Sequence, residues 1–116
     1  MGWEDVRVET GRMALGKIGE DIAAAFLERR GVVVVDRNVR VGRDEIDLLV
    51  SVDGRRVAVE VKTARHEQDR PEENFDHLKE QRVRRAAGAV GATRVDLITV
   101  VLDASGARVR WLSDVG

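Results

Sequence analysis

Two β-patterned runs, 45–52 and 55–62, flank the dipeptide Asp53-Gly54 and form the clearest structural pattern in this chain. An Asp-Gly pair between alternating apolar residues is a strong signal for a two-residue hairpin with a type I′ turn. Turn length fixes hairpin register, so Val52 should pair with Arg55, and counting outward gives each later pair.

This register predicts which side chains share a face of the hairpin. Asp47 should lie directly opposite Glu60, and Glu45 opposite Lys62. Because strand side chains alternate between faces, one face should be polar and the other apolar. The predicted polar face holds Glu45, Asp47, Leu49, Ala58, Glu60 and Lys62, and the apolar one holds Ile46, Leu48, Val50, Val57, Val59 and Val61. We expect the apolar face to belong to the core.

The remaining pattern predicts two helices and three further strands. Apolar steps of three and four indicate a helix over 13–30 that Gly31 ends, and a second helix is expected over 75–90. The further strands are a β-branched run at 32–35, a fourth strand over 94–102, and a short fifth strand through Val109, Trp111 and Leu112. The order α-β-β-β-α-β-β predicts a single α/β domain over 13–116, with a mixed sheet flanked by helices and a loose lead-in over 1–12.

The run Val32–Val35 is typical of a strand that is covered on both faces. The first helix is the only nearby element that could cover one face, so we expect it to lie over the polar side of the hairpin. Glu20, an acid among small and apolar residues of that helix, would then approach Asp47 and Glu60. The alternative is that Glu20 is a partly exposed helix acid with no further role.

Composition favours a small intracellular protein. The chain has 116 residues, 43% of them hydrophobic, and no cysteine, which excludes disulfides and thiolate metal sites. Neither a signal-peptide core nor an apolar run of membrane-spanning length is present, so we expect a cytoplasmic protein without membrane contact.

The charge balance argues against nucleic-acid binding through bulk charge alone, because the net charge is −1 although 35% of residues are charged. A localised basic surface is still possible. The candidates for phosphate contact are Lys79 and Arg82 on the second helix, Arg40 and Arg43 before the hairpin, and Arg65 after it. Each could equally be a solvated surface charge.

The predicted carboxylate pair indicates a cation site. Two carboxylates about 5 Å apart repel by roughly 3 kcal/mol at an effective dielectric constant near 20, and by less than about 1 kcal/mol in bulk water. A covered pair therefore needs a shared proton or a cation, and oxygen donors without Cys or His favour Mg²⁺ or Mn²⁺. The predicted metal ligands are Asp47, Glu60, the backbone carbonyl of Val61, and Glu20 directly or through water. Lys62 is placed to orient an attacking water and offset phosphate charge.

This arrangement resembles the PD-(D/E)xK nuclease motif of restriction endonuclease-like folds, with Asp47 followed by Glu60-Val61-Lys62 and a helical Glu20 upstream. Together with Gly19-Glu20, Arg37-Asn38, Glu45-Ile46-Asp47-Leu48 and Val59-Glu60-Val61-Lys62-Thr63, the pattern is similar to the YraN family of small bacterial proteins. That family is similar in fold to archaeal Holliday-junction resolvases. The resemblance implies a restriction endonuclease-like core, binding of nucleic acid with DNA favoured over RNA, and metal-dependent endonuclease activity.

Two positions depart from the family pattern. Asp44 stands where glycine is usual before Glu-Ile-Asp, and Thr63-Ala64-Arg65 stands where Thr-Arg is usual. An extra acid beside the site could alter the approach of metal or DNA, and the altered loop could change substrate choice.

Three functional hypotheses follow from the sequence. The leading one is a Mg²⁺- or Mn²⁺-dependent endonuclease with Glu20, Asp47, Glu60 and Lys62 as catalytic residues. The second is a nucleic-acid-binding module of the same fold that does not cleave, although three acids near a phosphate give binding no advantage. The third is a structural or partner-binding protein with a solvated ion-pair face. The oligomeric state is left open, and a homodimer is one possibility because symmetric cutting of a junction needs a two-fold axis.

Overall fold

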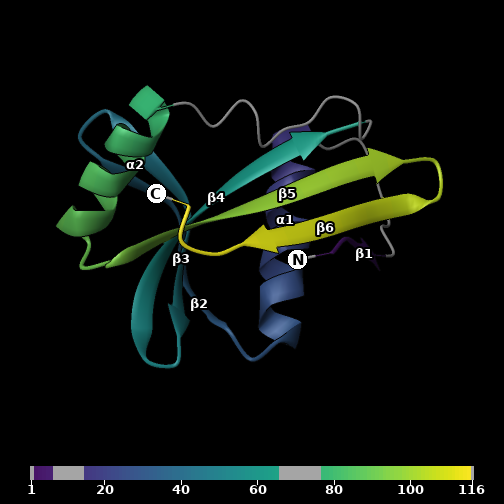
Figure 1. Cartoon of the computed structure of the whole chain (residues 1–116), viewed down its shortest axis with the longest axis horizontal. Coiled ribbons are helices and arrows are strands. Elements are labelled where there is room, and N and C mark those ends of the chain that lie inside the picture. The colour runs from purple at the N-terminus through teal and green to yellow at the C-terminus, as the bar shows by residue number, and fades with distance from the viewer. Residues whose placement is uncertain (1, 7–14, 66–76, 116) are drawn as a thin grey trace.

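The computed structural model describes residues 2–6, 15–65 and 77–115, which form one α/β domain (Figure 1). The elements in chain order are β1 (Glu4–Val6), α1 (Leu15–Arg29), β2 (Val33–Val41), β3 (Asp44–Val52), β4 (Arg55–Ala64), α2 (His77–Ala89), β5 (Arg94–Asp103) and β6 (Gly106–Leu112). The predicted order of helices and strands is confirmed, with the short β1 added in front. The polar, charge-mixed segment 66–74 is predicted from its sequence to be a loop, and Val6 and Val8 of the lead-in to make an edge contact. The segment 66–74 and Val8 lie outside the described residues.

The six strands form one mixed sheet in the order β1-β6-β5-β4-β3-β2. Among the described strands, only the central pair β4 and β5 is parallel, and every other neighbouring pair is antiparallel. Two neighbouring parallel strands need a crossover connection between them. Here α2, which lies between β4 and β5 in sequence, belongs to the connection that brings the chain back to the end of the sheet where β4 begins.

The two helices pack on opposite faces of the sheet, toward different ends (Figure 1). The core beneath α1 joins Phe26 and Leu27 to the β-strand residues Leu48, Val50, Val57, Val59, Ile98 and Val100. The core beneath α2 joins Val83, Ala86 and Ala87 to Ile46, Leu49 and Ala58. The expectation that α1 covers the polar face of the hairpin was therefore wrong. The helix α1 covers the apolar face, and α2 covers the face that carries Leu49 and Ala58.

The predicted hairpin turn is confirmed. Asp53 and Gly54 both have positive φ, 51° and 81°, as a type I′ turn requires, and Val52 pairs with Arg55. The described ladder continues only to Leu48 and Val59. Beyond that point the predicted pairs Asp47–Glu60 and Glu45–Lys62 are not part of it. Ile46 and Leu48 also lie in different cores, so the expected single apolar face was wrong at Ile46.

The strand β2 is an edge strand rather than the doubly covered strand expected from its β-branched start. Val33 and Val35 are 60% and 46% exposed, and the ladder to β3 shifts register between Val34 and Asp36. A register shift of this kind bends an edge strand and hinders pairing with another chain. The sequence predicts that Arg37-Asn38 and Arg40–Arg43 form a turn before the hairpin, with its bend at Gly42. Arg37 and Asn38 instead lie within β2, whereas the bend at Gly42 is confirmed by its φ of 60°.

The described ends of the chain are tied to the sheet. Residues Glu4–Val6 pair with β6, which confirms the edge contact expected for Val6. Trp111 packs against the core beneath α1, and its indole Nε1 donates a hydrogen bond of 2.8 Å to Asp96 Oδ2. Neither described helix is long and apolar enough to cross a membrane.

Candidate metal and nucleic-acid site

Glu20 is held at the sheet by a close helix–strand approach at the preceding residue. Gly19 is buried on α1, and a Cβ placed there would lie 1.8 Å from Thr63 Oγ1 and 2.9 Å from Thr63 Cβ on β4. Only glycine allows this approach, because rotating the Thr63 side chain would leave its Cβ in place. The half-buried Glu20 is therefore fixed beside the end of the hairpin.

Asp47 lies close enough to Glu20 to affect the ionisation of the Glu20 carboxyl group. Burial raises the pKa of Glu20 above its ordinary value, and the negative charges of Asp47 and, more weakly, Glu45 raise it further. A hydrogen bond from Asn38 and the charge of Arg37 act in the opposite direction without reversing the shift. Acids from α1 and β3 thus gather at one place.

Asn38 bridges two of these acids. With its amide nitrogen turned toward them, it donates to Glu20 Oε1 at 3.0 Å and to Glu45 Oε1 at 3.1 Å. Its φ is 52°, which is unusual inside a strand for any residue but glycine, although asparagine tolerates it better than most. This backbone turn coincides with the point where pairing opposite Asp47 is missing from the β2–β3 ladder.

Asp47 lies on β3 just beyond the last residue pair of the β3–β4 ladder. Its Oδ2 accepts a 2.8 Å hydrogen bond from the backbone N–H of Val61, in place of the cross-strand pairing expected with Glu60. The predicted convergence of Glu20, Asp47 and Glu60 is present only in part. Within the described residues, no set of three or more His, Cys, Asp or Glu side chains is grouped as a metal-binding cluster.

Glu60 lies on the α2 side of the sheet. It is only 6% exposed and lines a groove of about 340 Å³, here called the carboxylate groove. The residues lining it are Arg43, Asp44, Glu45, Glu60, Arg82 and Val83. Glu45 therefore belongs both to this groove and to the cluster around Glu20. Lys62 is half-buried two residues beyond Glu60 on β4, so alternation directs it to the same face.

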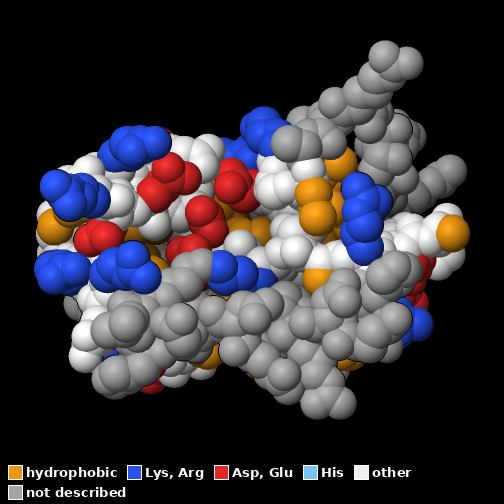
Figure 2. Space-filling model, turned by 90° about the horizontal axis from the view of Figure 1, so that it is seen from above, with side chains coloured by type: hydrophobic (Ala, Val, Ile, Leu, Met, Phe, Trp, Pro, Cys, Tyr) orange, Lys and Arg blue, Asp and Glu red, His pale blue; other side chains and the backbone are white. Residues whose placement is uncertain are grey.

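Acidic and basic side chains gather on one surface of the molecule. Figure 2 shows acidic side chains grouped on the upper face with Lys and Arg side chains around them. Of the predicted phosphate contacts, Arg43 and Arg82 line the carboxylate groove. Arg40 has a 77% exposed side chain 3.9 Å from Glu45, Arg65 is exposed just after β4, and the side chain of Lys79 lies outside the described residues.

Two residues important to this arrangement were not among the candidate site residues. Asn38 was noted only as part of a motif, and nothing in a strand pattern indicates a positive φ. Arg85 ion-pairs with Asp44 at 3.8 Å and adds a third arginine near the groove. Its position could have been found from its spacing, since Arg82 and Arg85 are three residues apart and share one side of a helix.

Comparison with known proteins identifies related sequences. Residues 19–100 match the family described as "Uncharacterised protein family UPF0102". A UPF0102 protein from Solibacter usitatus is 41% identical over 109 residues, covering 84% of this chain and 81% of the relative. One from Corynebacterium efficiens is 39% identical over 103 residues, covering 83% and 84%, and one from Dictyoglomus thermophilum is 30% identical over 106 residues, covering 84% and 90%.

Among solved structures, the chain is similar to SfsA from Pyrococcus furiosus, determined in complex with Ca²⁺. The match has a TM-score of 0.38 and 16% sequence identity, and covers 88% of this chain and 63% of SfsA. A likeness this distant carries no argument about the site.

Proposed function

This chain belongs to the uncharacterised protein family UPF0102, and from that premise we propose that it is a Mg²⁺- or Mn²⁺-dependent endonuclease that hydrolyses phosphodiester bonds. The sequence resemblance to the PD-(D/E)xK nucleases supports this proposal, because Asp47, Glu60, Lys62 and Glu20 supply the residue types of that motif.

One observation carries the proposal: Glu20 and Asp47, from a helix and a strand, are held so close that the charge of Asp47 raises the pKa of Glu20. Like charges this close are unfavourable in the folded protein unless a proton or a cation binds between them. Glu45 adds a third negative charge, and the Asn38 amide that bridges Glu20 and Glu45 is neutral.

The donors suit a hard cation. Asp47, Glu60, Glu20 and the Val61 carbonyl offer only oxygen, which Mg²⁺ and Mn²⁺ prefer, and the chain has no cysteine to favour a softer metal. When bound, such an ion supplies an activated water and neutralises charge on the phosphate. Asp47 and Glu60 would hold it, with Glu20 reaching it directly or through a water.

The remaining roles belong to side chains of this protein. The Glu20 carboxylate, with its raised pKa, is suited to accept a proton from the attacking water. The Lys62 ammonium would offset the negative charge of the phosphate, and Arg43 and Arg82, which border the carboxylate groove, would hold the nucleic-acid backbone.

DNA is the proposed substrate, in a branched or otherwise structured form, because the sequence pattern resembles proteins similar to Holliday-junction resolvases. Cutting such a junction symmetrically would require a homodimer. The absence of cysteine agrees with a cytoplasmic location.

A cleavage assay tests this proposal. Linear, flapped and four-way-junction DNA are incubated with the protein and Mn²⁺ or Mg²⁺, using wild type, D47N, E60Q and the control E28Q. Glu28 is an exposed acid on the same helix as Glu20, so its removal matches the charge change alone. We expect cleavage of at least one substrate by wild type and E28Q, reduced by about 100-fold or more in D47N and E60Q. Binding without cleavage by wild type would instead support the non-catalytic binding module.

A further inference from the structure

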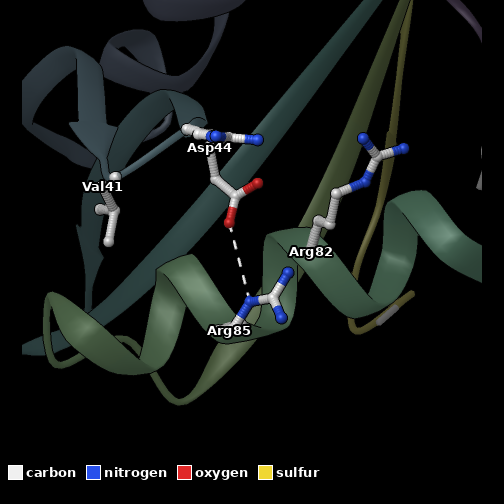
Figure 3. A pocket seen from close by; sticks show the side chains of 6 residues that line it. Val41, Asp44, Arg82 and Arg85 are labelled. Atoms are coloured by element: carbon white, nitrogen blue, oxygen red, sulfur yellow. Dashed lines mark ion pairs between the residues drawn. The ribbon is translucent and has the colours of Figure 1, made fainter.

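A second groove lies next to the carboxylate groove, between the β2–β3 turn and α2. Its volume is about 480 Å³, and it is lined by Val41, Gly42, Arg43, Asp44, Arg82 and Arg85. We call it the arginine groove. Figure 3 shows Asp44 extending from the start of β3 toward Arg85, with Arg82 rising from α2 beside it.

The charges in the arginine groove are unbalanced. Three arginines face one acid, and that acid is already shared with Arg85 at a distance of 3.8 Å. Within the described part of the chain, neither Arg43 nor Arg82 forms an ion pair. The Asp44 side chain is 19% exposed and the Arg85 side chain 73% exposed, so the pair is open to water on the arginine side. The groove therefore retains positive charge and unused guanidinium donors.

The two grooves adjoin. Arg43, Asp44 and Arg82 line both of them, so these three residues stand between the space beside Glu45 and Glu60 and the space beside Arg85. Guanidinium groups bind phosphate oxygens through paired, charge-assisted hydrogen bonds, and Arg82 and Arg85 project from one side of α2. A polymer with regularly spaced phosphates fits two adjoining grooves lined by arginines better than a single small anion does.

We infer that the arginine groove binds a phosphate of the nucleic-acid backbone that neighbours the phosphate at the carboxylates, and that Asp44 weakens this binding by competing for Arg85. This inference rests on the proposed function for the placement of the strand. The ligand chemistry is a phosphate ester, either internal to a strand or at its end.

Binding of a labelled single-stranded oligonucleotide in EDTA tests the inference without metal or cleavage. R85A and R82A should each weaken binding by about tenfold in low salt, and each should reduce the slope of log K against log salt concentration by about 0.7. D44N should tighten binding by about threefold, because it frees Arg85 from its ion pair. R84A is the matched control, since Arg84 is exposed on α2, pairs with Glu80 and lies outside both grooves.

Competitors identify the source of the phosphate. An unlabelled oligonucleotide without terminal phosphate that competes as well as a phosphorylated one indicates an internal phosphodiester. Competition only by the phosphorylated oligonucleotide and by thymidine monophosphate indicates a strand end. Both outcomes support a phosphate site, provided that the effect is lost in R85A.

Equal affinities and equal salt slopes for wild type, R85A, R82A and D44N would overturn the inference. So would an effect of R84A as large as that of R85A, because binding would then depend on the charge of α2 in general. Since the assay contains no metal, loss of cleavage in D47N with normal binding tests the nuclease proposal separately. If the protein cleaves DNA but R85A leaves binding unchanged, the proposed function stands and the phosphate site in the arginine groove does not.

Discussion

Two acidic centres in this domain have opposite surroundings. Asp96, fully buried on β5, is surrounded by donors: Arg94 Nε and Nη2 at 2.9 and 3.0 Å, Trp111 Nε1 at 2.8 Å and the backbone N–H of Asp114 at 2.8 Å. Glu20, on α1, lies near the acids Asp47 and Glu45. Burial is therefore a poor guide to function here, because the more deeply buried acid is the one with the complete donor set.

The comparison separates a structural acid from a candidate binding site. The donors of Asp96 come from Arg94 on β5, from Trp111 on β6 and from Asp114 after β6. The Asp96 carboxylate therefore ties the segment after β6 to the sheet. Around Glu20, three acids lie together, and the Asn38 amide, the charge of Arg37 and the exposed Arg40 beside Glu45 leave the pKa of Glu20 raised. A cation can improve the second arrangement and has no role in the first.

Removing the charge of Asp96 should have the largest effect. D96N leaves Arg94 and the Trp111 N–H facing an amide, and we expect the free energy of unfolding to fall by about 3–5 kcal/mol, as for other broken buried pairs. Urea denaturation measures this loss. A loss below about 1 kcal/mol would contradict the structural role given to Asp96.

Closing the space at Gly19 should have the next largest effect. G19A places a methyl group against Thr63, and overpacking of this kind costs about 1–3 kcal/mol. T63A should restore part of the loss, because it removes Oγ1 and leaves the Thr63 Cβ, which is 2.9 Å from the new methyl. Additive effects in the double-mutant cycle would show that α1 does not approach β4 at this point.

Asn38 offers a sharper test of the acidic cluster. N38D puts a carboxylate between Glu20 and Glu45, and we expect a loss of about 1–2 kcal/mol in unfolding free energy at pH 7. N38G also removes the amide but relieves the positive φ of 52°, so it should lose less. Thermal unfolding at low salt compares the two, and equal losses would mean that charge at this position is unimportant.

The pH dependence of Glu20 should give the smallest effect. Its folded-state pKa is raised from 4.5, so the charged carboxylate destabilises the fold above the raised pKa and this penalty is absent below the unfolded value. In EDTA, E20Q should therefore be more stable than wild type at pH 7, and the difference should disappear as the pH falls below about 4.5. A difference that grows on acidification would have the wrong sign for this account.

Local signals in the sequence predicted much of the fold. The turn at Asp53-Gly54 and the pairing of Val52 with Arg55 were correct because turn chemistry acts over a few residues. The order of helices and strands was also correct. The placement of Glu20 near Asp47 was correct too, although the assumed packing of α1 on the polar face was wrong.

The errors come from irregular backbone and from strand order. Counting along a regular strand placed Ile46 with Leu48, but the β2–β3 ladder skips Asp47, the β3–β4 ladder ends at Leu48, and Ile46 and Leu48 lie in different cores. Nothing in the β-branched run at Val33 shows that β2 is an edge strand, because strand order depends on contacts distant in sequence. Asp96 could have been noticed as an acid within an apolar run, which indicates a buried and partnered carboxylate.

Titration of the metal-free protein with Mn²⁺ tests the central claim that the acids around Glu20 and Asp47 form a cation site. Calorimetry and thermal unfolding are compared for wild type, D47N and the control E28Q. The account predicts saturable binding and a rise in unfolding temperature for wild type and E28Q, both lost in D47N. Equal Mn²⁺ affinity and equal stabilisation in D47N and wild type would contradict it.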